Sequence, residues 1–245
     1  MKTRIDGRCR LCTGDGPLQK SHVIPEWLYR WLYDGIYHRY QVIKAAPLPK
    51  RRFEQKGLRE RLLCQACETK LSVYEGYARR VFLDGQEITV VQRNDGLELR
   101  DLDYVKLKLF QLSILWRAGI AQQEFFSQVE LGYHQELLRK LLLLGNPGKG
   151  TEYGCVMIPM VAEGSLLTDL IVQPVSVRSG EFDGFRFVFG GHTCIYVLGD
   201  GQYFPFAKLF LQEDGRLVIR RADAKVDRFL RRLGSTFGNV SVSTT

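Results

Sequence analysis

Four kinds of segment are missing from the 245-residue sequence, and their absence limits the classes of protein to which it can belong. No uninterrupted apolar run reaches the roughly 18 residues that a membrane-spanning helix needs, and the first ten residues, MKTRIDGRCR, lack the apolar core of a signal peptide. Low-complexity tracts and internal repeats are also missing, and a hydrophobic content of 45% excludes a disordered or collagen-like chain. We therefore expect a folded cytoplasmic protein that has no membrane partner.

Acidic residues are scarce in the first third of the chain. Residues 1–80 hold 17 Lys and Arg against 8 Asp and Glu, a net charge of +9, whereas residues 81–245 hold 18 against 19. A basic segment beside a neutral remainder favours a polyanion partner, nucleic acid and DNA first, because neutralising phosphates releases counterions. The alternative is a basic surface that is merely solvated.

Cysteine is also infrequent, but four of the six cysteines form two C-x-x-C pairs, Cys9 with Cys12 and Cys64 with Cys67. Two pairs of equal spacing predict a tetrahedral Zn²⁺ site, and the 51 residues between the pairs must form an excursion with its own structure. Because four thiolates would fill the coordination shell, this zinc would be structural and not catalytic. The alternative is four buried free cysteines.

Hydrophobic periodicity in the first part of the chain predicts one helix before and one helix after a basic segment. Glu26–Tyr33 has apolar side chains at helical spacing, and residues 66–82 form a second helical pattern. Between them, residues 44–61 hold two prolines and seven Lys and Arg against two Glu, which predicts an extended basic loop or an edge strand. We expect a module over residues 1–85.

The remainder, residues 86–245, is predicted to be an α+β body. An Asn94-Asp95-Gly96 turn predicts a hairpin over residues 87–100. Residues 103–145 are predicted to be helical, with helices at Tyr104–Ala118 and Tyr133–Leu144 and a shorter one beginning near Gln122. Residues 152–221 are predicted to be β-rich, with strands in YGCVMIPMV, LIVQPVSV, FRFVFGG, TCIYVLG, FAKLFLQ and RLVIRR, followed by a short basic helix at 223–233.

A histidine lies between the two cysteine pairs, in the run Ser21-His22-Val23-Ile24-Pro25. The order of a C-x-x-C pair, a histidine-bearing strand and a second C-x-x-C pair that opens a helix resembles the zinc-ribbon branch of the HNH endonucleases over residues 9–80. That resemblance implies a ββα-metal core in which His22 is the general base that activates water, assisted by a catalytic Mg²⁺ or Mn²⁺. A lone histidine with a structural role is the alternative.

The sequence departs from the family pattern at several positions. Family members carry Asp or Glu before the histidine and often Asn after the second cysteine pair, whereas this chain has Ser21 and Glu68, and the closing His or Asn of the helix is missing. Glu68 and Glu75 lie seven residues apart, on one face of the predicted helix, so they are candidate catalytic carboxylates. Alternatively, Glu68 is a first-turn acid and Glu75 pairs with Arg79 at i,i+4.

Six basic residues directly before the second cysteine pair are candidate phosphate ligands. They are Lys50, Arg51, Arg52, Lys56, Arg59 and Arg61. In the HNH-like arrangement they would flank the His22 strand and contact a nucleic-acid backbone. Trp27 and Trp31 could stack on bases, although their helical spacing favours a core role.

We therefore expect an α+β protein with a zinc-stapled ββα-like N-terminal module, a helical middle and an antiparallel β-rich C-terminal portion. The leading function is a metal-dependent DNA endonuclease of HNH-like type. Segments of residues 103–145 resemble bacterial HNH-like proteins associated with phage defence. The alternative is a non-catalytic zinc-ribbon nucleic-acid-binding protein that has lost the catalytic metal site, and a third is a protein adaptor that uses zinc only to fold. The C-terminal portion is expected to sense a ligand, bind a protein partner or form a homo-oligomer.

The basic segment generates a test of nucleic-acid binding. Neutralising Arg51, Arg52 and Lys56 together should weaken binding to unrelated DNA sequences alike, because phosphate contacts are independent of sequence. The slope of log K against log salt should flatten by roughly one unit for each lost contact. Titrations by fluorescence anisotropy at several salt concentrations measure this slope, and an unchanged slope would locate the polyanion surface elsewhere.

Overall fold

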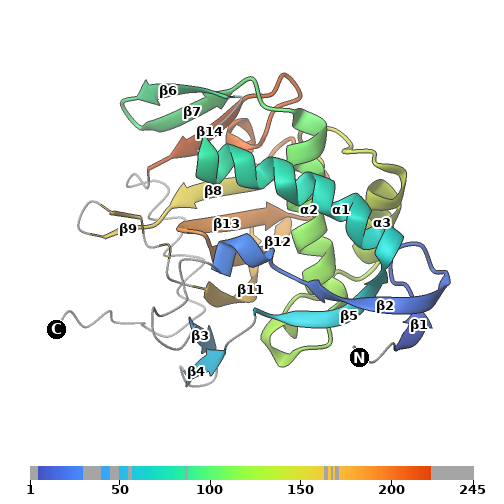
Figure 1. Ribbon diagram of the computed structural model, residues 1–245. Helices are drawn as coiled ribbons and strands as arrows, with labels where there is room; N and C mark the ends of the chain where they lie inside the picture. The colour runs from blue at the N-terminus through green and yellow to red at the C-terminus, as the bar shows by residue number, and fades with distance from the viewer. Residues whose placement is uncertain are drawn as a thin grey trace.

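The computed structural model describes residues 5–29, 40–44, 50–54, 57–85, 88–162, 165–166, 168 and 171–221. Over these ranges the protein has the mixed α+β architecture expected from its sequence, with helices packed beside largely antiparallel sheets (Figure 1). The α-helices of the described residues are α1 (Gln65–Arg79), α2 (Tyr104–Ile120) and α3 (His134–Leu144).

The N-terminal sheet has the strand order β1-β2-β5, and its strands are antiparallel. They span β1 (Asp6–Arg8), β2 (Asp15–His22) and β5 (Arg59–Cys64). Helix α1 follows β5 without a loop and continues as a π-helical turn, η2 (Arg80–Asp84). The helix predicted at residues 66–82 is therefore confirmed, and β2, β5 and α1 form a ββα unit in chain order.

The largest sheet has six strands in the order β4-β3-β11-β12-β13-β8. The strands are β3 (Tyr40–Lys44), β4 (Lys50–Glu54), β8 (Cys155–Pro159), β11 (Ile171–Ser179), β12 (Phe182–Phe189) and β13 (His192–Val197). All neighbours are antiparallel except β3 and β11, which are parallel. The basic segment thus contributes an edge strand, β4, to a sheet built mainly from the C-terminal half.

Two smaller sheets complete the architecture. The first has the order β14-β7-β6, with strands β6 (Thr89–Arg93), β7 (Gly96–Arg100) and β14 (Leu217–Arg220). Arg93 is paired with Gly96 across the Asn94–Asp95 turn, so the predicted hairpin is confirmed. The second is a two-stranded pair, β9 (Val161–Ala162) and β10 (Ser165–Leu166).

Some predicted elements have a different form. The helix expected at Glu26–Tyr33 is a 3-10 turn, η1 (Glu26–Tyr29), and residues 30–33 lie outside the described ranges. The helix expected near Gln122 is the 3-10 turn η3 (Glu124–Phe126). The basic helix predicted at residues 223–233 also lies outside the described residues.

The strand predicted in FAKLFLQ is wrong, because this run forms a third 3-10 turn, η4 (Ala207–Leu209). The Phe210 N–H donates to the Ala207 carbonyl oxygen at 3.0 Å, which is the i→i+3 pattern of such a turn. Three consecutive residues, 209–211, are buried. Consecutive residues are also buried in strands β8 and β13, so the apolar run by itself could not distinguish a turn from a strand.

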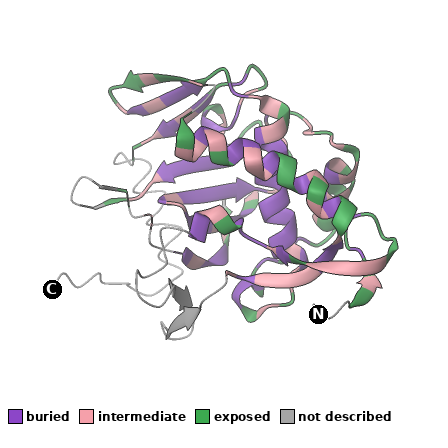
Figure 2. Cartoon of the chain, viewed as in Figure 1, coloured by how far each residue is buried: buried purple, intermediate pink, exposed green. Residues whose placement is uncertain are grey.

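Helix α2 occupies the centre of the molecule and contacts α1, α3 and β8 (Figure 2). Buried residues make up 13 of its 17 positions, including the predicted core residues Phe110, Leu112, Leu115 and Trp116. Cys155 and Cys194 are buried as well. One cluster of buried side chains extends from Cys9 to Ile219, so the core is shared by the two segments predicted from the sequence.

Helix α2 also buries a lysine. The Lys108 ammonium group donates to the carbonyl oxygens of Tyr153 at 3.2 Å and Gly150 at 3.4 Å. Burial lowers the pKa of Lys108 from 10.5 to about 8, although electrostatic interactions with Cys155, Glu152 and Glu213 partly oppose this shift.

The lowered pKa predicts how stability depends on pH. Between about pH 8 and 10.5 the unfolded chain keeps the Lys108 proton while the folded chain has released it, so stability rises with pH across this window. Relative to a Lys108→Met variant, the wild type should gain about 3 kcal/mol over the window. Urea unfolding of both proteins from pH 7 to about pH 11 measures this difference, and a difference that stays constant with pH would contradict it.

Candidate metal centre and the polar cluster beside it

The four predicted zinc ligands come together although they belong to distant parts of the chain. Cys9 and Cys12 lie in the turn between β1 and β2, while Cys64 ends β5 and Cys67 lies in the first turn of α1. Their Sγ atoms all lie within 4.8 Å of one another. Among the described residues this is the one group of three or more His, Cys, Asp or Glu side chains that could hold a metal ion.

Backbone hydrogen bonds fix the shape of the cysteine turn. The Cys9 N–H donates to the Gly14 carbonyl oxygen and the Thr13 N–H donates to the Cys9 carbonyl oxygen, both at 2.9 Å. The Cys64 N–H donates to the Cys9 Sγ atom at 3.3 Å, which joins the two cysteine pairs directly. The backbone hydrogen bonds thus fix the conformation of the turn, and the Cys64 N–H stabilises the Cys9 sulfur as an acceptor.

The distance between the sulfur atoms and the lowered pKa of Cys9 fit a tetrahedral zinc site. Zinc–sulfur bonds of about 2.3 Å in a tetrahedron separate the sulfurs by about 3.8 Å, and the Sγ atoms of Cys12 and Cys64 lie 3.8 Å apart. Burial tends to raise the pKa of Cys9, but N–H donors of Cys64, Cys12 and Leu11 lower it to about 7. Burial and the neighbouring thiols raise the pKa of Cys67, since the four cannot all ionise at such short range without a cation.

Helix α3 braces the cysteine turn from outside. The Arg139 guanidinium donates to the Leu11 carbonyl oxygen at 2.5 Å and forms a two-pronged ion pair with Glu136 at 2.7 and 2.8 Å. Lys70 on α1 donates to the Leu143 carbonyl oxygen, which ties α3 to the helix that carries Cys67. The metal centre is therefore attached to the helical middle of the protein.

A second cluster of polar side chains lies where β2 ends, between α1 and α2. The Ser21 hydroxyl, which is fully buried, donates to the Glu68 carboxylate on α1. The Arg117 guanidinium on α2 donates to the His22 carbonyl oxygen at 2.5 Å and pairs with the Glu75 carboxylate at 2.6 Å. Glu68 and Glu75 thus enter this cluster through their carboxylates, whereas His22 enters it through its backbone carbonyl, because its side chain alternates with that of Ser21 and points to the opposite face of β2.

The carboxylates of Glu68 and Glu75 lie in different surroundings. Glu75 pairs with Arg117, which supplies the carboxylate partner that an arginine in the apolar run of α2 requires, whereas the pairing of Glu75 with Arg79 considered from the sequence is not formed. Burial raises the pKa of Glu68, while the Ser21 hydrogen bond and the Arg117 charge act in the opposite direction and Glu75 adds to the rise. Glu68 therefore accepts a hydrogen bond from a neutral hydroxyl group, whereas Glu75 forms an ion pair with a guanidinium.

The His22 imidazole packs in a narrow space beside Gly57. A Cβ atom at Gly57 would lie 3.0 Å from His22 Cδ2 and 3.2 Å from His22 Nε2, and the backbone there has φ +67°. The Tyr29 ring lies 6.3 Å from the imidazole, centre to centre, and its hydroxyl accepts from the Leu58 N–H at 3.3 Å. His22 Nε2 is buried, so glycine at position 57 is what leaves room for the ring.

Basic side chains share the outer face of the ribbon formed by β2 and β5. Lys20 is paired with Arg61 across the ribbon and His22 with Arg59, so all four project from the same face. Lys20 is exposed, and Arg59 and Arg61 are half-buried. Side chains of β4 and residue Lys56 lie outside what the structure describes, so the predictions for Lys50, Arg51, Arg52 and Lys56 remain predictions.

Sequence reasoning missed three features of the surroundings of His22. They are Lys20 on the same face of the ribbon, Gly57 beside the imidazole, and the hydrogen bond from Arg117 to the His22 carbonyl oxygen. The alternation of β2 could have indicated Lys20, because it lies two residues before His22. Arg117 lies 95 residues from His22, and no local pattern predicts such a contact.

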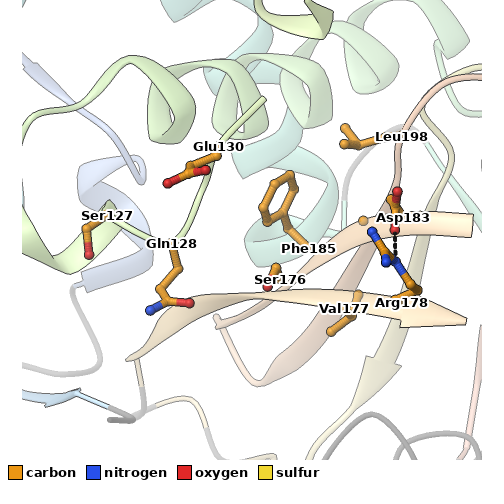
Figure 3. A pocket seen from close by; sticks show the side chains of 10 residues that line it. Ser127, Gln128, Glu130, Ser176, Val177, Arg178, Asp183, Phe185 and Leu198 are labelled. Atoms are coloured by element: carbon orange, nitrogen blue, oxygen red, sulfur yellow. Dashed lines mark hydrogen bonds and ion pairs between the residues drawn. The ribbon is translucent and has the colours of Figure 1, made fainter. Parts of the chain in front are cut away.

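A hollow on the body lies between the loop that follows η3 and strands β11 and β12, and it shares no lining residue with either cluster (Figure 3). It encloses about 600 Å³, and the Arg178–Asp183 ion pair, 2.6 Å long, lies at one end. Ser127, Gln128 and Glu130 form the opposite wall. None of the residues predicted to be functional lines it.

Comparisons of this chain with models of known protein families, with curated proteins and with solved structures found no match. In the described ranges, no helix has both the length and the apolar character needed to cross a membrane.

The cysteine cluster predicts one tightly bound Zn²⁺ per chain. Because thiolate binding energy orders a segment with little core of its own, Cys64→Ser should lose the metal and lower the melting temperature. Elemental analysis of the purified protein and thermal unfolding measure both effects. Cys194→Ser is the matched control, since it alters a buried cysteine of the β-sheet and should retain zinc. Less than half an equivalent of zinc in the wild type would contradict the prediction.

Proposed function

We propose that this protein is a metal-dependent DNA endonuclease of HNH-like type, built on a zinc-bound ββα unit. The observation that carries the proposal is the ββα unit itself: His22 is the last residue of β2, and Glu68, in the first turn of α1, accepts a hydrogen bond from the adjacent Ser21. This is where the HNH-like resemblance requires a histidine and a helix-borne metal ligand. The phage-defence setting implied by residues 103–145 is part of the same proposal.

In this proposal His22 is the general base. A neutral imidazole accepts a proton from water at neutral pH, and water so activated attacks a phosphodiester. The Arg117 hydrogen bond to the His22 carbonyl holds the strand end that carries this ring.

Glu68 is the carboxylate that would hold Mg²⁺ or Mn²⁺. Such ions are usually bound by one or two carboxylates together with substrate phosphates, so one carboxylate at the start of α1 is sufficient for this chemistry. When bound, the ion supplies positive charge at the scissile phosphate. Glu75 is committed to Arg117, and we assign it the role of orienting that guanidinium.

The outer face of the β2–β5 ribbon supports a nucleic-acid substrate. Lys20, Arg59 and Arg61 lie on the same face as His22, and no carboxylate of the described residues pairs with Lys20 or Arg59. Cations placed this way attract a phosphate backbone and bring it to the histidine. The net charge of +9 in residues 1–80 acts in the same direction.

One observation favours a second candidate, a non-catalytic zinc-ribbon nucleic-acid-binding protein. Glu75 forms an ion pair with Arg117, and Glu68 accepts a hydrogen bond from Ser21. The four cysteines are therefore the one group of several possible metal ligands among the described residues. A binding protein needs the basic face and the zinc but not a catalytic ion.

Substitution of His22 separates the two candidates. His22→Ala should lower plasmid nicking in Mg²⁺ or Mn²⁺ by about 10²- to 10⁴-fold and leave zinc content and DNA affinity near the wild-type values, because a general base contributes to the rate and little to ground-state binding. His134→Ala, which alters a histidine on α3, is the control and should cleave like the wild type.

Glu68→Gln should also lose activity, and additional Mn²⁺ should partly restore it if this carboxylate binds the catalytic ion. A wild-type protein that binds DNA but cleaves neither single nor double strands with any divalent ion would replace the endonuclease by the binding protein.

A further inference from the structure

The Arg117 guanidinium connects three elements that the sequence keeps far apart. It lies in the last turn of α2 and is almost completely buried. Its Nη1 group donates to the last residue of β2, His22, and its Nη2 group pairs with Glu75 on α1. The planar guanidinium thus spans the strand that carries the histidine and the helix that carries Glu68.

Arg117 is itself held in a fixed orientation. Its Nε donates to the Ser113 carbonyl oxygen at 3.2 Å, and its Nη2 donates to the Ser113 hydroxyl oxygen at 3.2 Å. That hydroxyl donates its own proton to the Phe110 carbonyl oxygen at 2.8 Å, which leaves a lone pair directed at the guanidinium. The preceding turn of α2 therefore orients the arginine before it reaches β2 and α1.

Net stability is a weak explanation for this arrangement. Burying an ion pair costs desolvation that the pairing often only offsets, and apolar residues of similar volume can stabilise a core equally well. What apolar residues cannot do is fix a backbone carbonyl relative to a carboxylate on another element. A lysine has three donors on one freely rotating nitrogen and lacks the planar guanidinium fork, so it would hold the carbonyl and the carboxylate less rigidly.

We propose that Arg117 is a positioning residue, which sets the His22 end of β2 at a fixed place relative to the acidic face of α1. The proposal rests on the proposed endonuclease function for its catalytic consequence, but the positioning itself is a property of the folded chain. Glu75 is part of the same device, because it holds the second nitrogen of the guanidinium. Arg117 contacts no substrate and acts only through His22.

The test compares Arg117→Lys with Glu75→Gln and uses two readouts. The chain has four histidines, so the ring signal of His22 in a ¹H–¹³C NMR spectrum is assigned by its loss in His22→Gln. In the zinc-bound full-length protein, Arg117→Lys should shift or broaden this signal and leave those of His134 and His192 in place. Nicking should fall about 10- to 100-fold, in kcat and not in KM, since displacing a reacting group by about 1 Å has an effect of that order.

Arg178→Lys is the matched control, because it makes the same chemical change in the exposed ion pair with Asp183. It should leave the His22 signal and the nicking rate unchanged. Glu75→Gln should move the His22 signal in the same direction as Arg117→Lys but less, because the amide oxygen still accepts from the guanidinium.

An unmoved His22 signal in both folded variants would overturn the proposal, as would wild-type nicking by Arg117→Lys. If Arg117→Lys fails to fold, the signal in Glu75→Gln decides: a shift supports positioning and no shift refutes it. If the wild type does not cleave DNA, the endonuclease proposal fails, while the His22 signal still decides whether Arg117 positions that strand end.

Discussion

Convergence of four thiol groups from two distant segments is the constraint on which the N-terminal arrangement depends. The cysteines join the turn before β2 to the start of α1 across an excursion of 51 residues. Because Cys64 ends β5 and Cys67 begins α1, the same contact fixes where the helix leaves the ribbon. Glu68 follows Cys67 directly, so its place opposite Ser21 is a consequence of the thiol cluster.

The polar groups inside the core extend this constraint to the rest of the molecule. Helix α2 is central and mostly apolar, yet it buries Lys108 and Arg117, and each donates to backbone carbonyls of other elements. Buried charges need such partners, so only an alignment of α2 that reaches both the loop before β8 and the end of β2 satisfies them. These contacts therefore select one relative placement of the helices and the strands.

The cysteine cluster and the polar cluster are suited to separate tasks. Four thiolates would complete a tetrahedral shell and leave no position for water, so a zinc ion bound there would act as a scaffold. The end of β2 carries the groups proposed for catalysis: His22 lies on the basic face of the ribbon, and Ser21, on the opposite face, donates to Glu68. Arg139 bonds the cysteine turn to α3, so the scaffold is anchored to the body and not only to its own sheet.

The sequence by itself determined the features that arise from short-range patterns. Cysteine spacing predicted the thiol cluster, helical periodicity predicted α1, α2 and α3, and the Asn94-Asp95-Gly96 turn predicted the β6–β7 hairpin. Only the tertiary structure decided that Glu75 pairs with Arg117, that Gly57 makes room for His22, and that residues 207–209 form a turn and not a strand. The physical reason is range: propensity and periodicity act over a few residues, whereas these outcomes depend on packing between segments that meet only in the folded chain.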